Sequence, residues 1–347
     1  MDYLRITGLS LLLAVFYLGT GCSTVAENEP GFSYDKNELD QARPWTDQGF
    51  ENDPKQFQFA VIGDRTGGAD AQGVFSRAID QLNLLQPEFV INVGDSVEGY
   101  SDDKGELNNQ WDDFDSMIEK LQMRFFRTVG NHDMSNEVMR EVWHDRYGPT
   151  YYHFIYEDVL FLVLNTEEII RPAPKGMEEK IKLYNRLQVE DPAKAAEMLE
   201  EFMKDESVVA ALGKPVEFPA EQIAYINDVL EDNPDVRWTF IFLHSPVWEN
   251  PSDSFLSIEK LLADRQYTFF GGHLHYYDYA KRNDRDYITM GPAGASFHHD
   301  GPGNVDHIMW VTMGKDGPEL AKITLDGIYD RQGRDLEVKE IYERKGW

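Results

Sequence analysis

Apolar runs alternate along the chain with stretches in which apolar residues recur at helical spacing. The run Phe57–Ile62 has the length and composition of a buried strand, and residues 89–93 have the same character. Between them, Val74, Ala78 and Leu82 recur at helical spacing. Because strand, helix and strand in this order form a crossover unit, we expect the two strands to pair in parallel, with their carboxyl ends at one edge of a sheet.

The same alternation continues to residue 325. Further strands are expected at 124–129, 151–156, 159–164, 237–243 and 267–271, twice within 276–290, and at 307–313 and 319–325. Further helices are expected around Trp111, Phe114, Ile118 and Leu121, and at 137–147 and 219–230. Turn residues predict hairpins at 157–158, 283–284 and 314–318. The pattern is that of an α/β protein.

The segment 171–214 interrupts this alternation. It is rich in Glu, Lys, Ala, Leu and Met, it has no strand signal, and Pro172, Pro174 and Pro215 bound it. We therefore expect a helical insertion. Two interpretations stay open, a pair of helices packed on the edge of the domain or a cap over a pocket that shapes the choice of substrate.

The beginning of the chain has the features of an export signal. Residues 9–18 are almost wholly apolar, follow Arg5 and end at Gly19-Thr20-Gly21-Cys22, and the run is too short for a membrane span. Cys22 stands after small residues as in a bacterial lipoprotein cleavage site, although it could also lie by chance near an ordinary cleavage site. We expect a signal peptide at 1–21, a lipid anchor on Cys22, a flexible acidic tether at 22–54 and a folded domain at 55–347. The protein would then be periplasmic or at the cell surface, anchored to a bacterial membrane.

The charge balance narrows the expected partners. The chain has 62 acidic and 33 basic residues and a net charge of −29, so its surface repels nucleic-acid backbones and anionic lipid headgroups. Nucleic acid is therefore not an expected partner, and the lipid anchor is the one expected link to a membrane. Cys22 is the only cysteine, which excludes an intramolecular disulfide. No motif indicates an oligomeric state.

Five separated fragments carry the residues that suggest chemistry. Each stands at the end of an apolar run, so the strand ends could bring carboxylates, an amide and imidazoles into one pocket. The fragments are Gly63-Asp64-Arg65-Thr66, Gly94-Asp95-Ser96-Val97-Glu98, Gly130-Asn131-His132-Asp133, His244 within Phe242-Leu243-His244-Ser245-Pro246, and Gly272-His273-Leu274-His275. These donors suit two divalent metal ions, and a pair of metal ions suits the hydrolysis of a phosphate ester.

This ordered set of fragments resembles the calcineurin-like metallophosphoesterase superfamily, from about Phe57 to Leu325. The resemblance implies a four-layer α/β/β/α sandwich of two mixed sheets. It also implies a metal-dependent hydrolase of phosphoric esters, in which a metal-bound hydroxide attacks a small-molecule phosphomonoester or phosphodiester. Two ions of Mn, Fe or Zn would be the cofactors, with their identity left open.

The resemblance also implies a ligand for each metal position. Asp95 would bridge the two ions. The implied ligands are Asp64, Asp95 and His275 for the first metal, and Asp95, Asn131, His244 and His273 for the second. The chain departs from the family pattern at Thr66, where most members have a histidine ligand. Glu98 stands where the purple acid phosphatase branch has a tyrosine ligand, so we predict that it supplies the missing donor; the alternative is a solvated loop acid.

The resemblance further implies that His132 assists departure of the leaving oxygen and that Asp133 holds its other ring nitrogen. Arg65 either contacts a phosphate oxygen or forms a salt bridge. A different class of function also stays open, a metal-stabilised surface module that binds a glycan or a protein and whose first metal site is impaired. Metal stoichiometry separates the two, since a binding module could hold one ion or none.

Overall fold

The computed structural model describes residues 53–66, 73–170, 176–202, 204, 213–297 and 303–326. The predicted signal peptide, Cys22 and nearly all of the predicted tether lie outside these residues. Within the described part of the chain, no helix is long and apolar enough to cross a membrane.

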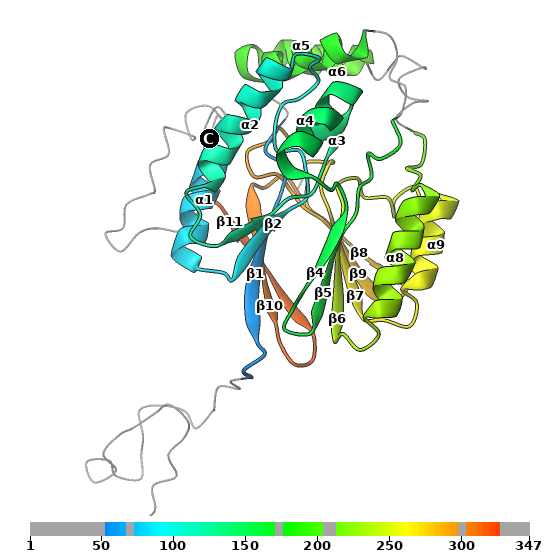
Figure 1. Cartoon of the computed structure of the whole chain (residues 1–347). Helices are drawn as coiled ribbons and strands as arrows, with labels where there is room; N and C mark the ends of the chain where they lie inside the picture. Colours follow the sequence, from blue (N-terminus) through cyan, green and yellow to red (C-terminus); the bar gives the residue numbers. More distant parts are fainter. Residues whose placement is uncertain are drawn as a thin grey trace, which may run out of the picture. The chain divides into compact units, whose positions relative to one another are not determined.

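The described residues form two sheets that lie face to face (Figure 1). The five-stranded sheet has the order β11-β10-β1-β2-β3 and the six-stranded sheet the order β4-β5-β6-β7-β9-β8. The strands of the first sheet are β1 (Phe57–Ile62), β2 (Phe89–Asn92), β3 (Arg124–Phe126), β10 (His307–Met313) and β11 (Pro318–Thr324). Those of the second are β4 (Tyr152–Tyr156), β5 (Val159–Val163), β6 (Trp238–Phe242), β7 (Tyr267–Gly271), β8 (Asp278–Arg282) and β9 (Arg285–Thr289).

Both sheets are mixed, with parallel strands at their centres. β1 pairs in parallel with β2, and β5, β6, β7 and β9 follow one another in parallel. Antiparallel strands complete the sheets, because β10 pairs with β1, and β4 and β8 pair with β5 and β9. The predicted turn at Asn283–Asp284 has φ values of 53° and 55°, as the tight hairpin between β8 and β9 requires. The predicted parallel pairing and the predicted sandwich of two mixed sheets are confirmed.

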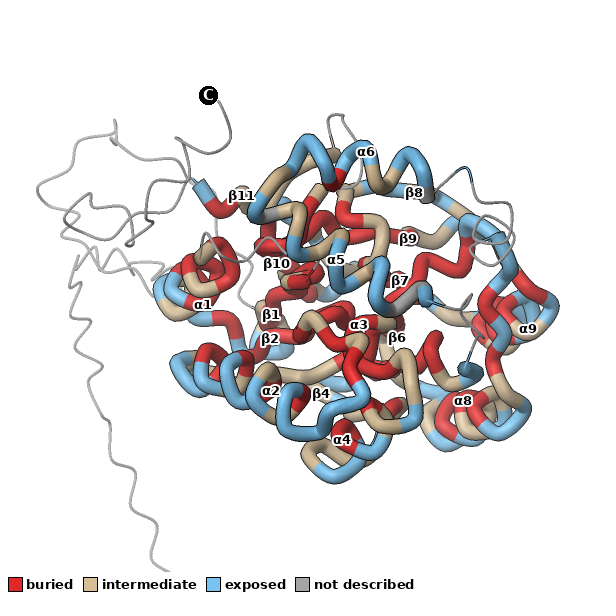
Figure 2. The backbone as a smooth tube through the Cα atoms, turned by 90° about the horizontal axis from the view of Figure 1, so that it is seen from above, coloured by how far each residue is buried: buried red, intermediate tan, exposed pale blue. Residues whose placement is uncertain are grey.

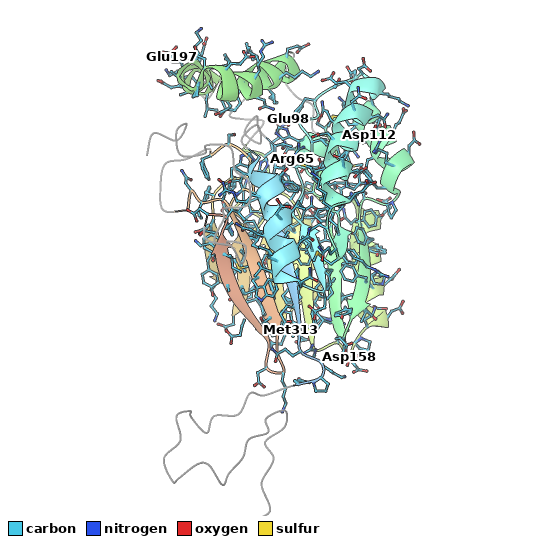
Figure 3. All side chains as sticks on the ribbon, turned by 90° about the vertical axis from the view of Figure 1, so that its left-hand side faces the viewer. Arg65, Glu98, Asp112, Asp158, Glu197 and Met313 are labelled. Atoms are coloured by element: carbon cyan, nitrogen blue, oxygen red, sulfur yellow. The ribbon has the colours of Figure 1, made fainter. Side chains whose placement is uncertain are left out.

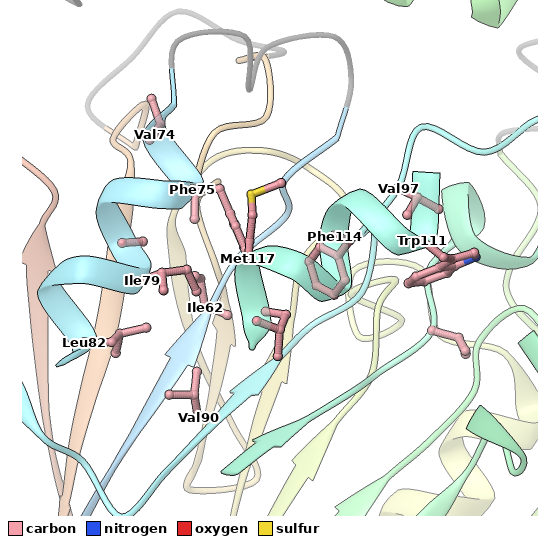
Figure 4. Close-up of a cluster of buried hydrophobic side chains, with 14 of the residues drawn as sticks. Ile62, Val74, Phe75, Ile79, Leu82, Val90, Val97, Trp111, Phe114 and Met117 are labelled. Atoms are coloured by element: carbon pink, nitrogen blue, oxygen red, sulfur yellow. The ribbon is translucent and has the colours of Figure 1, made fainter. Parts of the chain in front are cut away.

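Three apolar clusters hold the layers together. Aromatic rings fill the space between the sheets, where Phe59, Phe161 and Phe242 are fully buried. Helices α1 (Val74–Leu85), α2 (Lys104–Ile118) and α4 (Glu137–Tyr147) pack on the first sheet, and Figure 4 shows part of that cluster. Helices α8 (Ala220–Asp232) and α9 (Asp253–Leu261) pack on the second sheet. Burial of these apolar faces is the main stabilising contribution to the fold.

The main differences from the prediction concern β3, α2 and α9. β3 ends at Phe126 rather than at residue 129. Beyond Phe126, hydrogen bonds to Asn92 replace the backbone pairing between β2 and β3. Asn92 Oδ1 accepts from Thr128 N at 2.6 Å, and the Asn92 carbonyl accepts from the Thr128 hydroxyl at 2.7 Å. α2 ends at Ile118, so Leu121 lies outside it. The sequence reading also missed α9, which begins after Ser252, whose hydroxyl accepts from Phe255 N.

The segment predicted as a helical insertion contains α5 (Met177–Glu190) and α6 (Pro192–Phe202). Both helices lie across one end of the sandwich, as the side view and the view from above agree (Figures 1 and 2). Residues 171–175, 203 and 205–212 of the segment lie outside the described residues. The two helices therefore stand at the end of the molecule where the strands of the crossover units finish.

Candidate metal centre

The predicted site residues follow directly after strands of both sheets. Asp64 follows β1, Asp95 follows β2, and His244 follows β6, while His273 and His275 follow β7. Because these strands are parallel within their sheets, their carboxyl ends meet at one end of the sandwich. Figure 3 shows Arg65 and Glu98 at this end and Met313 and Asp158 at the opposite end.

The side chains form two donor groups that share one carboxylate. Asp95, His244 and His273 make one group, and Asp64, Asp95 and His275 make the other, with the ligand atoms of each group within 4.8 Å of one another. His244 Nε2 lies 3.2 Å from Asp95 Oδ2 and 3.2 Å from His273 Nδ1. His275 Nε2 lies 3.3 Å from Asp64 Oδ2. The structure thus brings together the five side chains that the sequence assigned to the metals as carboxylate and imidazole donors.

Asn131 belongs with the donor group of Asp95, His244 and His273. It begins the short helix α3 (Asn131–Met134), and its Oδ1 lies 2.9 Å from His244 Nε2. Its Nδ2 donates to the Tyr100 hydroxyl at 2.8 Å, which orients the amide with its oxygen toward His244. An amide oxygen held in this way is a suitable ligand beside imidazole and carboxylate.

The backbone at this end of the molecule is strained. Asp95, His273 and His275 have φ values of 54°, 71° and 54°, in the left-handed region that a residue with a side chain rarely adopts. Such conformations persist where the surrounding structure enforces them, and they cluster at functional sites. Here they aim ligand side chains from adjoining loops at a shared point.

Two glycines let the backbone approach the carboxylates closely. A Cβ atom at Gly130 would lie 2.2 Å from Asp95 Oδ1, and one at Gly272 would lie 2.3 Å from Asp64 Oδ1. Both distances are far below van der Waals contact, so a side chain at either position would displace a carboxylate. The glycines of these two fragments are therefore required by the donor arrangement itself.

The buried carboxylates and imidazoles of the centre shift one another's pKa. Burial favours the neutral form of His244, but the carboxylates of Asp95 and Asp64 outweigh burial and raise its pKa to about 10. Burial, reinforced by Asp95, raises the pKa of Asp64 well above its usual range. For Asp95, burial alone would raise the pKa, but the facing imidazoles of His244 and His132 lower it below its usual range. A proton on His244 thus occupies the place that a metal cation would take.

The residues fit a pair of metal ions. Asp64 Oδ1 is buried and has no hydrogen-bond partner among the described residues, an arrangement that is costly unless a cation is bound. Two imidazole nitrogens facing each other at 3.2 Å are likewise natural ligands of one ion. Mixed carboxylate, amide and imidazole donors suit Zn, Mn or Fe.

His132 is held beside this centre by its backbone and by its ring. Its N–H donates to Asp95 Oδ1 at 2.9 Å, its Nδ1 lies 2.9 Å from the Glu98 carbonyl, and its ring meets the Tyr100 ring edge to face. A carbonyl accepts only, so Nδ1 carries the proton and Nε2 is the nitrogen left for chemistry.

The prediction that Asp133 orients His132 is wrong. The Asp133 carboxylate is fully buried and accepts from Ser96 N at 2.8 Å, Val97 N at 3.3 Å and Gly130 N at 2.9 Å. Its position in the first turn of α3 directs it to these backbone groups, and burial together with Asp95 raises its pKa to about 7. Asp133 therefore fastens the loops after β2 and β3 to each other. The group that orients the His132 ring is the Glu98 carbonyl, in place of Asp133.

The structure does not bring Glu98 into either donor group. Its carboxylate accepts from Asn185 Nδ2 of α5 at 3.0 Å. Thr66, at the position of the missing histidine, is buried, and its hydroxyl has no hydrogen-bond partner in the described part of the chain. The replacement of that histidine by Glu98 stays a prediction.

Arg65 is engaged on the protein side. Its Nη1 donates to the Ser96 carbonyl at 3.0 Å and its Nη2 to Asp113 Oδ2 at 2.8 Å, while the guanidinium lies 5.9 Å from the ring centres of Phe75 and Phe114. The salt bridge that was one of two interpretations is present. Contact with a phosphate stays a prediction.

Sequence reasoning missed two residues of the site, Tyr100 and Asn185. Tyr100 touches both Asn131 and His132 and lies two residues beyond the fragment that ends at Glu98. Asn185 comes from α5, 87 positions away from Glu98. Neither stands in a motif, so neither left a signal of its own in the sequence.

Comparison with known proteins assigns the family. The model of the family "Calcineurin-like phosphoesterase" matches residues 57–277. No curated protein matches the chain. Among solved structures, a dimetal phosphatase from Danio rerio is similar over 78% of this chain and 99% of its own, with 13% sequence identity and a TM-score of 0.52. The purple acid phosphatase PPD1 from yellow lupin (Lupinus luteus) is similar over 79% of this chain and 53% of its own, with 13% identity and a TM-score of 0.48. The family match covers well over half of the sequence, and the chain belongs to the calcineurin-like phosphoesterase family.

Proposed function

We propose that this protein is a dimetal phosphoesterase that hydrolyses a phosphomonoester or a phosphodiester of a small molecule. The observation that carries the proposal is the sharing of Asp95 by two donor groups, since one carboxylate between two sets of ligands is what a pair of neighbouring ions requires. Asp64 and His275 would hold one ion, and Asn131, His244 and His273 the other. Family membership supports the reaction class.

Bound metal ions would supply Lewis acidity to the phosphate oxygens and lower the pKa of a bound water. The chain's own residues supply the remainder. His132 donates its Nδ1–H to the Glu98 carbonyl, which leaves Nε2 as the nitrogen that would hold a proton for the leaving oxygen. Arg65 is anchored beside Asp64, where its charge would draw an anionic ester toward the centre of an acidic protein.

Metal content measured together with turnover tests the proposal. Purified protein without its first 21 residues is expected to hold two ions of Mn, Fe or Zn per chain and to hydrolyse para-nitrophenyl phosphate or its bis-ester. The ratio of the two rates would assign monoester or diester preference. One ion or none, without turnover of either ester under any of the three metals, would refute the proposal.

That negative result would favour the binding-module alternative. The specific observation on its side is the first donor group, which has three donors, with Thr66 buried at the expected histidine position and Glu98 turned to α5. A module of this kind needs metal for stability only. Its melting temperature would rise with metal while no ester was cleaved.

We further propose that the mature protein is exported and held at a bacterial membrane by a lipid on Cys22. The apolar run at 9–18 and the small residues before Cys22 support this. Cys22→Ala should move the protein from the membrane fraction to the soluble fraction after expression in a bacterial host. Retention of the variant in the membrane fraction would contradict a lipid anchor.

A further inference from the structure

Helix α5 reaches the metal-centre loops through polar contacts. Asn185 Nδ2 donates to Glu98 Oε2 at 3.0 Å, and Lys182 Nζ lies 3.8 Å from Glu106 Oε2 of α2. The second contact is between half-exposed groups and contributes little. The first joins α5 to the loop that follows Asp95, so it connects the inserted segment to the site itself.

The same helix forms one wall of a pocket beside the metal centre. The pocket lies between the beginning of α1, helix α2 and helix α5, and Arg65, Glu98, Gly99, Asn185 and Arg186 are among the residues that line it. Arg65 is next in sequence to Asp64, and Glu98 is three residues beyond Asp95. A group of the substrate that extends away from the phosphate on this side would therefore lie against α5.

Glu98 contacts α5 with its side chain and His132 with its backbone. Its side chain accepts from Asn185, whereas its backbone carbonyl accepts from His132 Nδ1 at 2.9 Å. Only the bonds of a single residue separate the two acceptors. By restricting the Glu98 side chain, the hydrogen bond from Asn185 can restrain the backbone of Glu98, and with it the carbonyl that orients the imidazole.

We propose that Asn185 and Glu98 are positioning residues that orient His132 from α5. The proposal rests on the proposed function, because it concerns the group that assists the leaving oxygen. It also gives α5 a definite role, since one helix then lines the pocket for the leaving group and aligns the side chain that acts on it. Alignment of an acid matters most when the leaving group is basic, because a stable leaving anion needs little protonation.

Kinetics with two matched esters tests this relay. Asn185→Ala should lower kcat for phenyl phosphate about 10-fold, with a much smaller effect on para-nitrophenyl phosphate, whose leaving anion is more stable, and with KM nearly unchanged. Glu98→Ala should give the same selective loss while leaving α5 unaltered. The double variant should lose no more than either single variant, because both act through one contact.

A matched control is available on α8, none of whose residues lines the pocket. Asn227 Nδ2 donates to Glu231 Oε1 at 2.9 Å, so Asn227→Ala removes a helix-borne hydrogen bond of the same kind. It should alter neither rate. Equal losses for both esters in Asn185→Ala, or additive losses in the double variant, would overturn the relay. A loss of metal in Glu98→Ala but not in Asn185→Ala would also overturn it and assign Glu98 to the first metal.

A spectroscopic readout separates this proposal from the proposed function. In protein labelled with 15N-histidine, the Nδ1–H signal of His132, assigned with His132→Gln, should shift in Asn185→Ala and in Glu98→Ala and stay in place in Asn227→Ala. If the wild type cleaves no ester, the phosphoesterase proposal fails, whereas this signal still reports the coupling of α5 to His132. An unchanged signal in Asn185→Ala refutes the coupling whatever the activity.

Discussion

The two donor groups share Asp95, yet they differ in how completely the chain supplies them. The group around His244 adds His273 and the oriented amide of Asn131, so it offers four donors of three chemical types. The group around Asp64 adds only His275, and the residue at the family's additional ligand position is Thr66. One end of the sandwich thus carries a metal site with four protein ligands next to a metal site with three.

The difference lies in local sequence rather than in the fold. Both groups draw on loops after buried parallel strands, and both depend on a glycine that lets a carboxylate approach. What differs is the identity of single side chains at positions that the fold holds in place. We therefore expect unequal affinities for the two ions, with the His244 group filled first as metal is added.

The largest expected effect is that of removing the shared ligand. Asp95→Asn replaces an anionic bridge by a neutral amide, so hydrolysis should fall by about 1,000-fold or more and both ions should be lost or weakened together. Rates with the two nitrophenyl esters and metal content by mass spectrometry measure this. Turnover close to that of the wild type in a folded Asp95→Asn protein would exclude the bridging role.

Ligands that belong to a single group should separate the two ions. His244→Ala should abolish tight binding of the first equivalent of metal, whereas His275→Ala should leave that equivalent and weaken only the next. Because these are direct ligands, the loss should exceed the ~10–100-fold typical of outer partners. Titration with Mn or Zn followed by calorimetry gives the two affinities. Identical curves for the two variants would mean that the groups do not bind independently.

A smaller effect is expected from crowding one group without removing a ligand. In Gly272→Ala the new methyl would press on Asp64 Oδ1 and on Val93, so the weaker ion should lose roughly 10-fold in affinity while the stronger ion keeps its own. The matched change Gly130→Ala presses on Asp95 and should weaken both ions. If Gly272→Ala disturbed both equally, the two groups would have to be treated as one rigid unit.

The smallest effect concerns pH. The pKa of His244 is raised to about 10 in the metal-free protein, so between its ordinary value near 6.5 and 10 the folded chain carries a proton there. Metal must displace that proton, so affinity should rise with pH across this window and level off above it. The same raised pKa means that the ion pairs of His244 stabilise the metal-free fold fully below about 6.5 and cease to do so as pH rises through 10. Calorimetry in two buffers of different ionisation enthalpy should report the release of at least about one proton; no release would show that His244 is neutral before metal binds.

Much of the fold and of the donor set could be predicted because both depend on local patterns. Gly-Asp and Gly-His fragments after apolar runs place ligands at strand ends, and parallel topology then brings those ends together. The sequence reading of α9 failed although the signal was present, with Ser252 before apolar residues at helical spacing. The residues that predict α9 are therefore present in the sequence.

Other parts of the site depend on contacts that the sequence does not record. Asp133 was predicted to bind the ring of its sequence neighbour His132, but in the folded chain its carboxylate accepts from three backbone N–H groups. The expectation for Asp133 failed because Ser96 and Val97, which lie far from it in the sequence, supply two of these N–H groups once the loops are packed together. Asn185 likewise comes from the distant helix α5, and the sequence does not indicate that it donates to Glu98.

The pairing of β10 with β1 joins the two extremes of the domain, since Phe57 stands opposite Met313. During synthesis β1 is made early, and its partner β10 is made only after almost the entire domain. Throughout that interval one flank of β1 is an open strand edge, apolar on the side that later faces the second sheet, and such edges recruit other chains. A truncated product that stops before residue 307 would therefore leave this edge of β1 permanently open to pairing with other chains and to aggregation.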